Sequence, residues 1–212
     1  RTSNNPVGDL IDWIKHNSSF TIVDPSTGEE EKREIRYNIV GFNSAKFDHF
    51  FLCQEAANRG DLSDVMYVNN SILSFSLYGH KPLDICKYLV CPLAAACAKF
   101  KTVPEKLAGF SHELPQKAFD AGGLEGLKKW FADNDRLQVR YSKYDVLSLA
   151  DLTTKFSQGI SKITGGASIF NYMTIGQMAY KLWQKTQTGS NDEKHHLYKL
   201  YQEAKEKNEK FE

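Results

Sequence analysis

The chain has 212 residues, 41% of them hydrophobic and 25% charged, and its formal net charge is +1. These totals are typical of one globular domain with at most an appendage, and they exclude a chain that is basic over its whole surface. No apolar run has the length of a membrane span, and no signal peptide is recognisable. The four cysteines lie in apolar stretches without a CxxC pair, which favours reduced thiols in an intracellular protein.

The first sixty residues alternate between helical and strand patterns. Apolar residues at helical spacing predict a helix over residues 7–16. A β-hairpin is expected next, with arms at residues 22–23 and 35–39 and the turn DPSTG between them. The charged run 29–33 is expected on a solvated face near that turn. Residues 49–60 predict a helix that ends on its glycine.

The middle of the chain predicts a second hairpin over residues 65–79, with the turn at Asn69-Asn70. Residues 81–89 predict a short strand that runs into a loop. Residues 92–101 predict a helix with proline in its first turn. Residues 103–122 show no clear period and are expected to form a loop.

The last part of the chain is predicted to be helical. A short amphipathic helix is expected over residues 123–135, a long helix over residues 136–163, and a further helix over residues 174–186. The charged tail 192–212 reads as a helix with little to bury. Strands first, with helices interleaved and later, predict an α/β class with a mixed sheet.

Two acids differ from the other carboxylates in their context. Asp48 follows a strand and opens a helix, whereas Asp145 lies inside the long helix among apolar neighbours. Tyr141 precedes Asp145 by one turn, and the face that they share with Ser148 is expected to point inward, where a carboxylate needs a partner. Each acid by itself is also compatible with a structural role, as a helix cap or in a bond to a backbone donor.

Taken together, the two acids suggest a shared divalent cation. Carboxylate oxygens are ligands that Mg²⁺ and Mn²⁺ prefer. Two such ions about 3.5–4 Å apart can stabilise the attacking and leaving oxygens of a phosphodiester displacement. In such a site, the hydroxyl of Tyr141 would orient the attacking water.

The motifs around these residues resemble those of a known family, the 3′–5′ exonuclease domain of protein-primed family B DNA polymerases from viruses and linear plasmids. FNSAKFD resembles the second exonuclease motif through Asn43, Phe47 and Asp48, and YSKYD resembles the third motif through Tyr141 and Asp145. The segment LDICKYLVCPLAAACAKF is similar to the region between them. KLAGFSHE resembles an element that carries a lysine, and TIGQMAYKLW resembles the start of the polymerase palm.

The resemblance covers about residues 35–185 and implies a ribonuclease H-like mixed sheet flanked by helices, of the DEDDy exonuclease type. It implies an exonuclease-like domain over residues 1–165 and a helical segment over residues 166–212 that leads toward a palm region. The implied cofactors are two Mg²⁺ or Mn²⁺ ions. The implied partners are a single-stranded DNA 3′ end, the remaining polymerase domains and a terminal priming protein, with no membrane. The implied locations are the cytoplasm, a mitochondrion or a virus-infected cell.

The resemblance also implies roles for individual residues. Metal ligation is assigned to Asp48 and Asp145, water orientation to Tyr141, and support of the scissile phosphate to Lys106; contacts with the DNA strand are assigned to Asn43, Phe47, Ile85 and Cys86. The alternatives are core packing for Phe47, Ile85 and Cys86, and a solvated loop lysine for Lys106. His49 and His112 are interpreted as surface or hydrogen-bonded residues rather than as metal ligands.

One part of the family pattern is missing. The first exonuclease motif, Asp-x-Glu on a strand, does not occur among the 42 residues that precede Asn43. Either the start has been cut away, as the opening RTSNN without methionine suggests, or this domain still binds DNA but has lost the hydrolytic reaction. The second hypothesis is therefore an inactive module that binds single-stranded DNA or a priming protein. A ribonuclease H-like nuclease acting on RNA and a purely structural domain remain as further alternatives.

Overall fold

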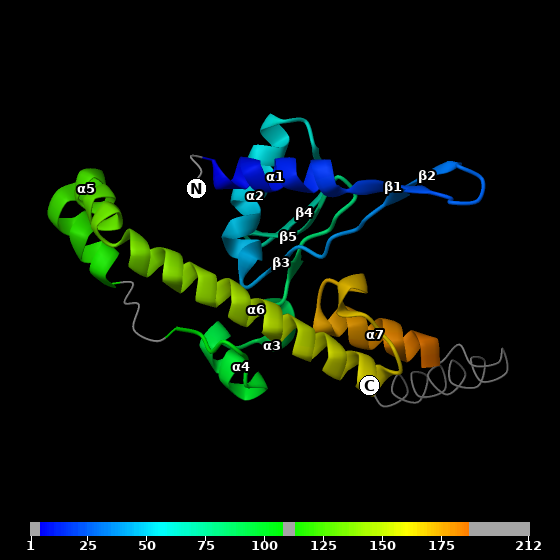
Figure 1. Cartoon of the computed structure of the whole chain (residues 1–212). Coiled ribbons are helices and arrows are strands. Elements are labelled where there is room, and N and C mark those ends of the chain that lie inside the picture. The colour runs from blue at the N-terminus through cyan, green and yellow to red at the C-terminus, as the bar shows by residue number, and fades with distance from the viewer. Residues whose placement is uncertain (1–4, 108–112, 187–212) are drawn as a thin grey trace, which may run out of the picture. The chain divides into compact units, whose positions relative to one another are not determined.

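The computed structural model describes residues 5–107 and 113–186 (Figure 1). Within this part of the chain the structure is α/β, with seven α-helices and three small two-stranded sheets. The chain divides into two compact units, Arg1–Gly159 and Ile160–Glu212. The functional boundary expected at residue 165 stays a prediction, since compactness alone does not assign a function to either unit. No helix within the described ranges is long and apolar enough to cross a membrane.

The first unit begins with α1 (Pro6–Asn17), as predicted. The Asn5 side chain caps it by accepting the Gly8 N–H at 3.0 Å, which satisfies one of the free donors of the first turn. Ile11 and Ile14 are buried on its inner face. Helical spacing of apolar residues was therefore sufficient to locate this element.

The first hairpin forms with a different second arm. β1 (Ser19–Val23) pairs antiparallel with β2 (Glu30–Glu34), so the prediction of residues 35–39 as the second arm was wrong. The DPSTG turn is short because Asp24 Oδ1 accepts the Ser26 N–H at 2.7 Å, and this closure sets Glu30 opposite Val23. Since every residue of β2 is exposed, a charged sequence can occupy that strand without a desolvation cost.

The main core of the first unit lies between two helices and the second hairpin. α2 (Asp48–Asn58) packs with α1 against β5 (Ser71–Leu77), which pairs with β4 (Leu62–Val68). The turn between these strands is Asn69-Asn70, with φ values of 46° and 58°, as predicted. The buried cluster has these members: Ile11, Ile14, Leu52, Cys53, Ala56, Ile72, Phe75 and Leu77.

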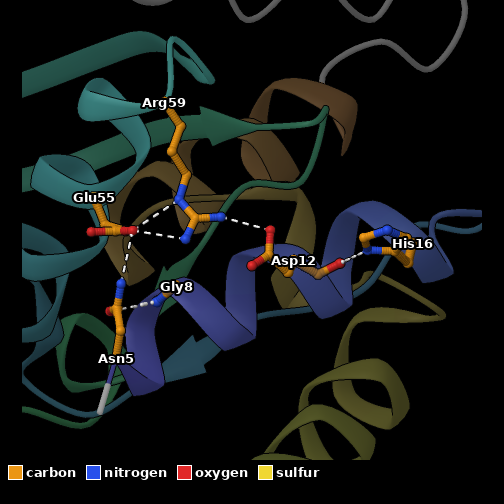
Figure 2. Close-up of polar contacts among 6 residues, drawn as sticks. All are labelled: Asn5, Gly8, Asp12, His16, Glu55 and Arg59. Atoms are coloured by element: carbon orange, nitrogen blue, oxygen red, sulfur yellow. Dashed lines mark hydrogen bonds and ion pairs between the residues drawn. The ribbon is translucent and has the colours of Figure 1, made fainter. Parts of the chain in front are cut away.

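A polar network joins α1 to α2 on the surface of this core (Figure 2). The Arg59 guanidinium lies 2.6 Å from Asp12 Oδ1 on α1 and 2.8 Å from Glu55 Oε1 on α2. The Asn5 amide donates to the same Glu55 oxygen at 3.1 Å. One arginine at the end of α2 therefore connects the two helices through two carboxylates.

The third strand pair is parallel and very short. β3 (Val40–Gly41) pairs with β6 (Leu83–Asp84), and each strand runs directly into helical turns. The 3-10 helix η1 (Ser44–Lys46) leads from β3 into α2, and α3 (Cys86–Leu89) follows β6. Parallel strands bring their carboxyl ends to the same edge, so both connections begin side by side.

A second buried cluster joins the helix after α3 to the long helix. α4 (Leu93–Phe100) contributes Ala96 and Cys97, and α6 (Asp135–Thr164) contributes Leu152. The Phe156 ring of α6 meets Phe100 edge-on at 5.9 Å. The bounds of both helices lie within one residue of the prediction.

The segment predicted as a loop over residues 103–122 is partly helical. α5 (Glu113–Asp133) begins ten residues earlier than expected and consists of two helical halves that fold back on each other at Gly123 (Figure 1). Gly123 has φ 58° and ψ −146°, a conformation that only glycine adopts readily. A Cβ on Gly126 would collide with the Ala118 carbonyl oxygen, so the two halves are in close contact. The first half of the helix was missed because α5 buries no residue, so its sequence lacks the one-sided apolar pattern that predicts a helix.

The second unit is described as far as residue 186. α6 ends at Gly165 and Gly166, which have positive φ values as predicted for helix-ending glycines. The 3-10 helix η2 (Ile169–Asn171) and α7 (Ile175–Thr186) follow, and Ile169 and Met178 are buried. The helix predicted over residues 192–212 lies outside the described residues.

Candidate functional site

The buried acid at the edge of the parallel pair is Asp84 of β6. It is 3% exposed, and its carboxylate accepts three backbone N–H groups, from Asn43 (2.7 Å), Ala45 (3.2 Å) and Cys86 (3.1 Å). These bonds hold the turn after β3 against the start of α3. Asn43 adopts a left-handed conformation with φ 57°, which asparagine tolerates better than most residues. Asp84 thereby fixes the backbone of the second exonuclease-like motif.

Phe47 and Asp48 lie at the exposed end of this turn. Phe47 is the N-cap residue of α2 and is 60% exposed, so core packing is not its role. Asp48 is the first residue of α2 and is also exposed. The helix-cap alternative for Asp48 is not observed, because Phe47 occupies the cap position and no side chain caps this helix. The positive end of the helix dipole favours a carboxylate at this position.

A separate set of contacts holds the loop after α4 along one face of α6. They are, in loop order, Lys155 Nζ to the Lys101 carbonyl (2.7 Å), the Val103 N–H to Asp151 Oδ2 (2.8 Å) and Ser148 Oγ to the Pro104 carbonyl (2.9 Å). The residue numbers of the loop partners rise while those of their partners on α6 fall, so the loop runs antiparallel to the helix. This register places Lys106 beside Asp145.

Lys106, Tyr141 and Asp145 form one group, as their predicted roles require. Lys106 Nζ lies 3.2 Å from Asp145 Oδ2 and 5.3 Å from the centre of the Tyr141 ring. Burial by itself would lower the pKa of Lys106, but the Tyr141 hydroxyl and the Asp145 carboxylate outweigh it, and the pKa lies above its usual value. The amine therefore stays protonated at neutral pH, so it suits contact with an anion and not proton abstraction.

The second oxygen of Asp145 has a different environment. Oδ1 is buried and has no hydrogen-bond partner among the described residues. A buried carboxylate oxygen without a partner costs free energy, and such a group calls for an explanation by a ligand or an ordered water. The inward-facing prediction for this helix face is confirmed, since Ser148 and Leu152 are fully buried one and two turns later.

The metal prediction has only partial structural support. The unpartnered oxygen of Asp145 fits one ligand position of a hard cation. However, no group of three or more histidine, cysteine or acidic side chains occurs within the described ranges. The convergence of the two acids on one ion therefore stays a prediction.

Two of the predicted DNA contacts, Ile85 and Cys86, directly follow β6. Ile85 is fully buried, so its side chain belongs to the core and does not line an open strand channel. The core-packing alternative accounts for this burial, since Ile85 directly follows β6 and is the N-cap residue of α3. Cys86 is half-buried, and burial, followed by the charge of Asp84, raises the pKa of its thiol. All four cysteines are free thiols.

Of the two histidines left out of the site, the structure describes only His49. His49 is buried, with Nδ1 2.8 Å from the Ile72 carbonyl and Nε2 3.0 Å from Ser44 Oγ. Ser44 is buried as well, so this serine–histidine pair is closed to substrate and stabilises the turn. His112 lies outside the described residues.

Comparison of the chain with protein-family models, with curated proteins and with solved structures finds no match. A function for the chain therefore depends on its motifs and on the geometry of the Lys106–Tyr141–Asp145 group.

Sequence reasoning missed the role of Asp84. The residue lies in LDIC, which was compared with the family only as an intervening segment. An acid between Leu83 and Ile85, both of which are buried, is the pattern that could have identified it, because a charge in such a run needs dedicated donors. The three donors come from two different connections, which the linear sequence does not bring together.

Proposed function

We propose that this chain is the 3′–5′ exonuclease, or proofreading, portion of a protein-primed DNA-directed DNA polymerase, built on a ribonuclease H-like fold. The observation that carries the proposal is the Lys106–Tyr141–Asp145 group, with an ammonium, a phenol and a partly buried carboxylate whose Oδ1 has no hydrogen-bond partner among the described residues. The parallel pair β3–β6, with helices directly after each strand, is compatible with that fold.

Each residue has a role in this proposal. Asp145 and Asp48 would hold the divalent ions, which supply Lewis-acid stabilisation of the phosphate oxygens when bound. Tyr141 would orient a water, whose oxygen attacks the terminal phosphorus while the bond from phosphorus to the preceding 3′ oxygen breaks. The products are a nucleoside 5′-monophosphate and a strand shortened by one nucleotide. Lys106 would offset the negative charge that develops on the phosphate.

A second function is favoured by one observation. Phe47 and Phe51 on α2 are 60% and 62% exposed, and exposed aromatic rings are a common platform for bases of single strands. An inactive module that grips single-stranded DNA is therefore the alternative.

The decisive experiment compares Asp145→Ala with the parental chain in Mn²⁺ on a 5′-labelled single-stranded DNA. The parental chain should shorten the strand slowly from its 3′ end, and the variant should lose at least about 100-fold in rate while binding persists. Asp135→Ala, on an exposed position of the same helix, is the matched control. Digestion by Asp145→Ala at the parental rate would refute the assignment.

If the hydrolytic activity of the chain is too weak to measure, binding of Mn²⁺ can be measured instead. Mn²⁺ that binds the folded state should raise the midpoint of thermal unfolding of the parental chain. Asp145→Ala should remove this shift, and Asp135→Ala should retain it. Binding of DNA without any Mn²⁺ shift would favour the binding module, and RNA oligonucleotides tested in parallel would separate DNA from RNA as the substrate.

A further inference from the structure

A cavity of about 600 Å³ lies between α5 and α6 and shares a wall with the Lys106–Tyr141–Asp145 group. Three aromatic side chains line it: Phe119 and Phe131 from the two halves of α5, and Tyr141 from α6. Phe119 and Phe131 remain 40% and 41% exposed, and α5 buries no residue at all. The volume is in the range of small-molecule sites, so the helical hairpin leaves a ligand-sized aromatic space unfilled.

Tyr141 lies next to both this cavity and the ammonium group of Lys106. Its ring is part of the cavity lining, and the same ring lies 5.3 Å from Lys106 Nζ. A ligand with its flat part among the aromatic rings would therefore lie close to a protonated amine, since Lys106 contacts the same tyrosine that lines the cavity. A ligand that combines an aromatic ring with a nearby anion fits this arrangement.

The polar lining narrows the ligand class further. Gln116 and Gln138 line the cavity together with Ser142, and no acidic side chain is among its described lining residues. Each glutamine uses Nε2 internally, toward Asp120 Oδ1 (2.8 Å) and the Phe131 carbonyl (3.2 Å) respectively. Each amide still has an oxygen and a second N–H for a ligand. The edge of a nucleobase can pair with these free amide groups, which a wholly apolar ligand cannot do.

We propose that this cavity binds the base of the 3′-terminal nucleotide of single-stranded DNA, with the adjoining phosphate at Lys106. The base stacks between Phe119 and Phe131, and its edge meets the two glutamine amides. The proposal rests on the proposed exonuclease function, because it takes the nucleotide to be the one whose phosphodiester bond is cut. It adds a base-binding site formed by α5, which none of the motifs contains.

The test measures binding of the full chain without metal, in EDTA, so that no strand is cut. Fluorescence anisotropy is recorded with two 5′-labelled single strands that differ only at the 3′ end, where one carries its terminal base and the other is abasic. Stacking of a base on an aromatic side chain changes affinity by about tenfold. The parental chain should bind the intact strand about tenfold more tightly than the abasic one.

Phe119→Ala and Phe131→Ala should each remove most of this difference without weakening binding of the abasic strand. Phe119→Leu, which keeps an apolar side chain without a π-face, serves if the alanine variant is poorly folded by circular dichroism. Leu124→Ala is the matched control, because Leu124 lies on the same helix but is 67% exposed and outside the cavity lining. It should preserve the difference.

Three results would overturn the proposal: equal binding of the two strands by the parental chain, an unchanged difference in both phenylalanine variants, or no binding of either strand. The last result would point to a protein partner for the cavity. Failure of the enzyme hypothesis looks different. Preference for the terminal base with neither Mn²⁺-dependent hydrolysis nor an Asp145-dependent Mn²⁺ shift in thermal unfolding would refute the exonuclease and support the cavity site, whereas hydrolysis that depends on Asp145 with no base preference would refute the cavity site alone.

Discussion

Two regions of the first unit use their side chains in opposite ways. Between α1, α2 and β5, the apolar residues are buried and the polar ones are paired: Phe75 and Leu77 are fully buried, and Arg59 contacts two carboxylates. Between α5 and α6, Phe119 and Phe131 stay half-exposed around a cavity.

The difference indicates which region can bind a ligand without losing contacts that it already has. In the first region nearly every group already has a partner, so a ligand would have to displace one. Around α6 an oxygen of Asp145 lacks a hydrogen-bond partner among the described residues, and Phe119 and Phe131 stay partly exposed around the cavity, so a ligand would add contacts there. Regions with incomplete packing are where function is most often found.

Core truncation should give the largest contrast between the regions. Phe75→Ala removes a fully buried ring that meets His49 at 5.2 Å, and it should lower the free energy of unfolding by about 3–5 kcal/mol. Leu124→Ala on α5 removes an exposed side chain and should change it by less than about 0.5 kcal/mol. Urea unfolding of both variants measures the contrast, and equal losses would show that α5 is packed as tightly as the core.

Removal of the Asp84 carboxylate should have the next largest effect. Asp84→Ala leaves three backbone donors without their acceptor and should cost about 2–4 kcal/mol in unfolding free energy. Asp84→Asn keeps one oxygen and should cost less. Amide hydrogen exchange at Asn43 and Ala45 should accelerate in both variants, and unchanged protection there would mean that the turn is held by other contacts.

His80 should make the stability of the first region depend on pH. The buried ring accepts the Tyr37 N–H at Nδ1 (3.0 Å), and its Nε2 lies 2.9 Å from Ser18 Oγ, so it is neutral. Burial, followed by the charge of Arg36, holds the pKa of His80 below 6.5. Below pH 6.5 the unfolded chain therefore takes up a proton that the folded chain does not, and stability falls until the folded pKa is reached.

This pH effect is isolated by difference, because carboxylates also titrate in acid. The unfolding free energy of the parental chain should decline more steeply between about pH 6.5 and about pH 5 than that of His80→Gln. His16→Gln, at an exposed position of α1, should behave like the parental chain. Parallel pH profiles for the parental chain and His80→Gln would show that His80 titrates equally in both states.

The Arg59 network should give the smallest change. Its side chain is partly exposed, so Arg59→Ala should lower the free energy of unfolding less than the variants above, and the loss should shrink as salt is added. Arg59→Lys keeps the charge but cannot contact Asp12 and Glu55 with one planar fork, so it should recover only part of the loss. A loss that does not respond to salt would indicate that packing of the side chain, and not its charge, joins α1 to α2.

Local patterns were enough for most elements of this chain. Helical spacing located α1, α2 and α6, and Asn69-Asn70 fixed the turn between β4 and β5. Spacing failed at β2, where charged residues form a strand that faces solvent on both sides, and at the first half of α5, which buries no residue. In both cases the pattern lacked the one-sided apolar face on which such predictions depend.

The candidate site could be predicted only in part. Tyr141 and Asp145 share a helix face because they are one turn apart, which the sequence states directly. Lys106 lies 39 residues before Asp145 in the sequence. It joins the two residues because the loop after α4 lies in a fixed register against α6. The burial of Asp84 rather than Asp48 follows from the parallel pairing of β3 with β6.

The sequence by itself determined the α/β class, most of the helices and turns, and the two carboxylate-bearing motifs, because these depend on residues a few positions apart. The tertiary structure decided which acid is buried, which lysine meets Asp145 and where an aromatic cavity opens beside Tyr141. Those outcomes depend on contacts between distant segments, and the free energy of such contacts is set by burial and by register between elements, which no local pattern encodes.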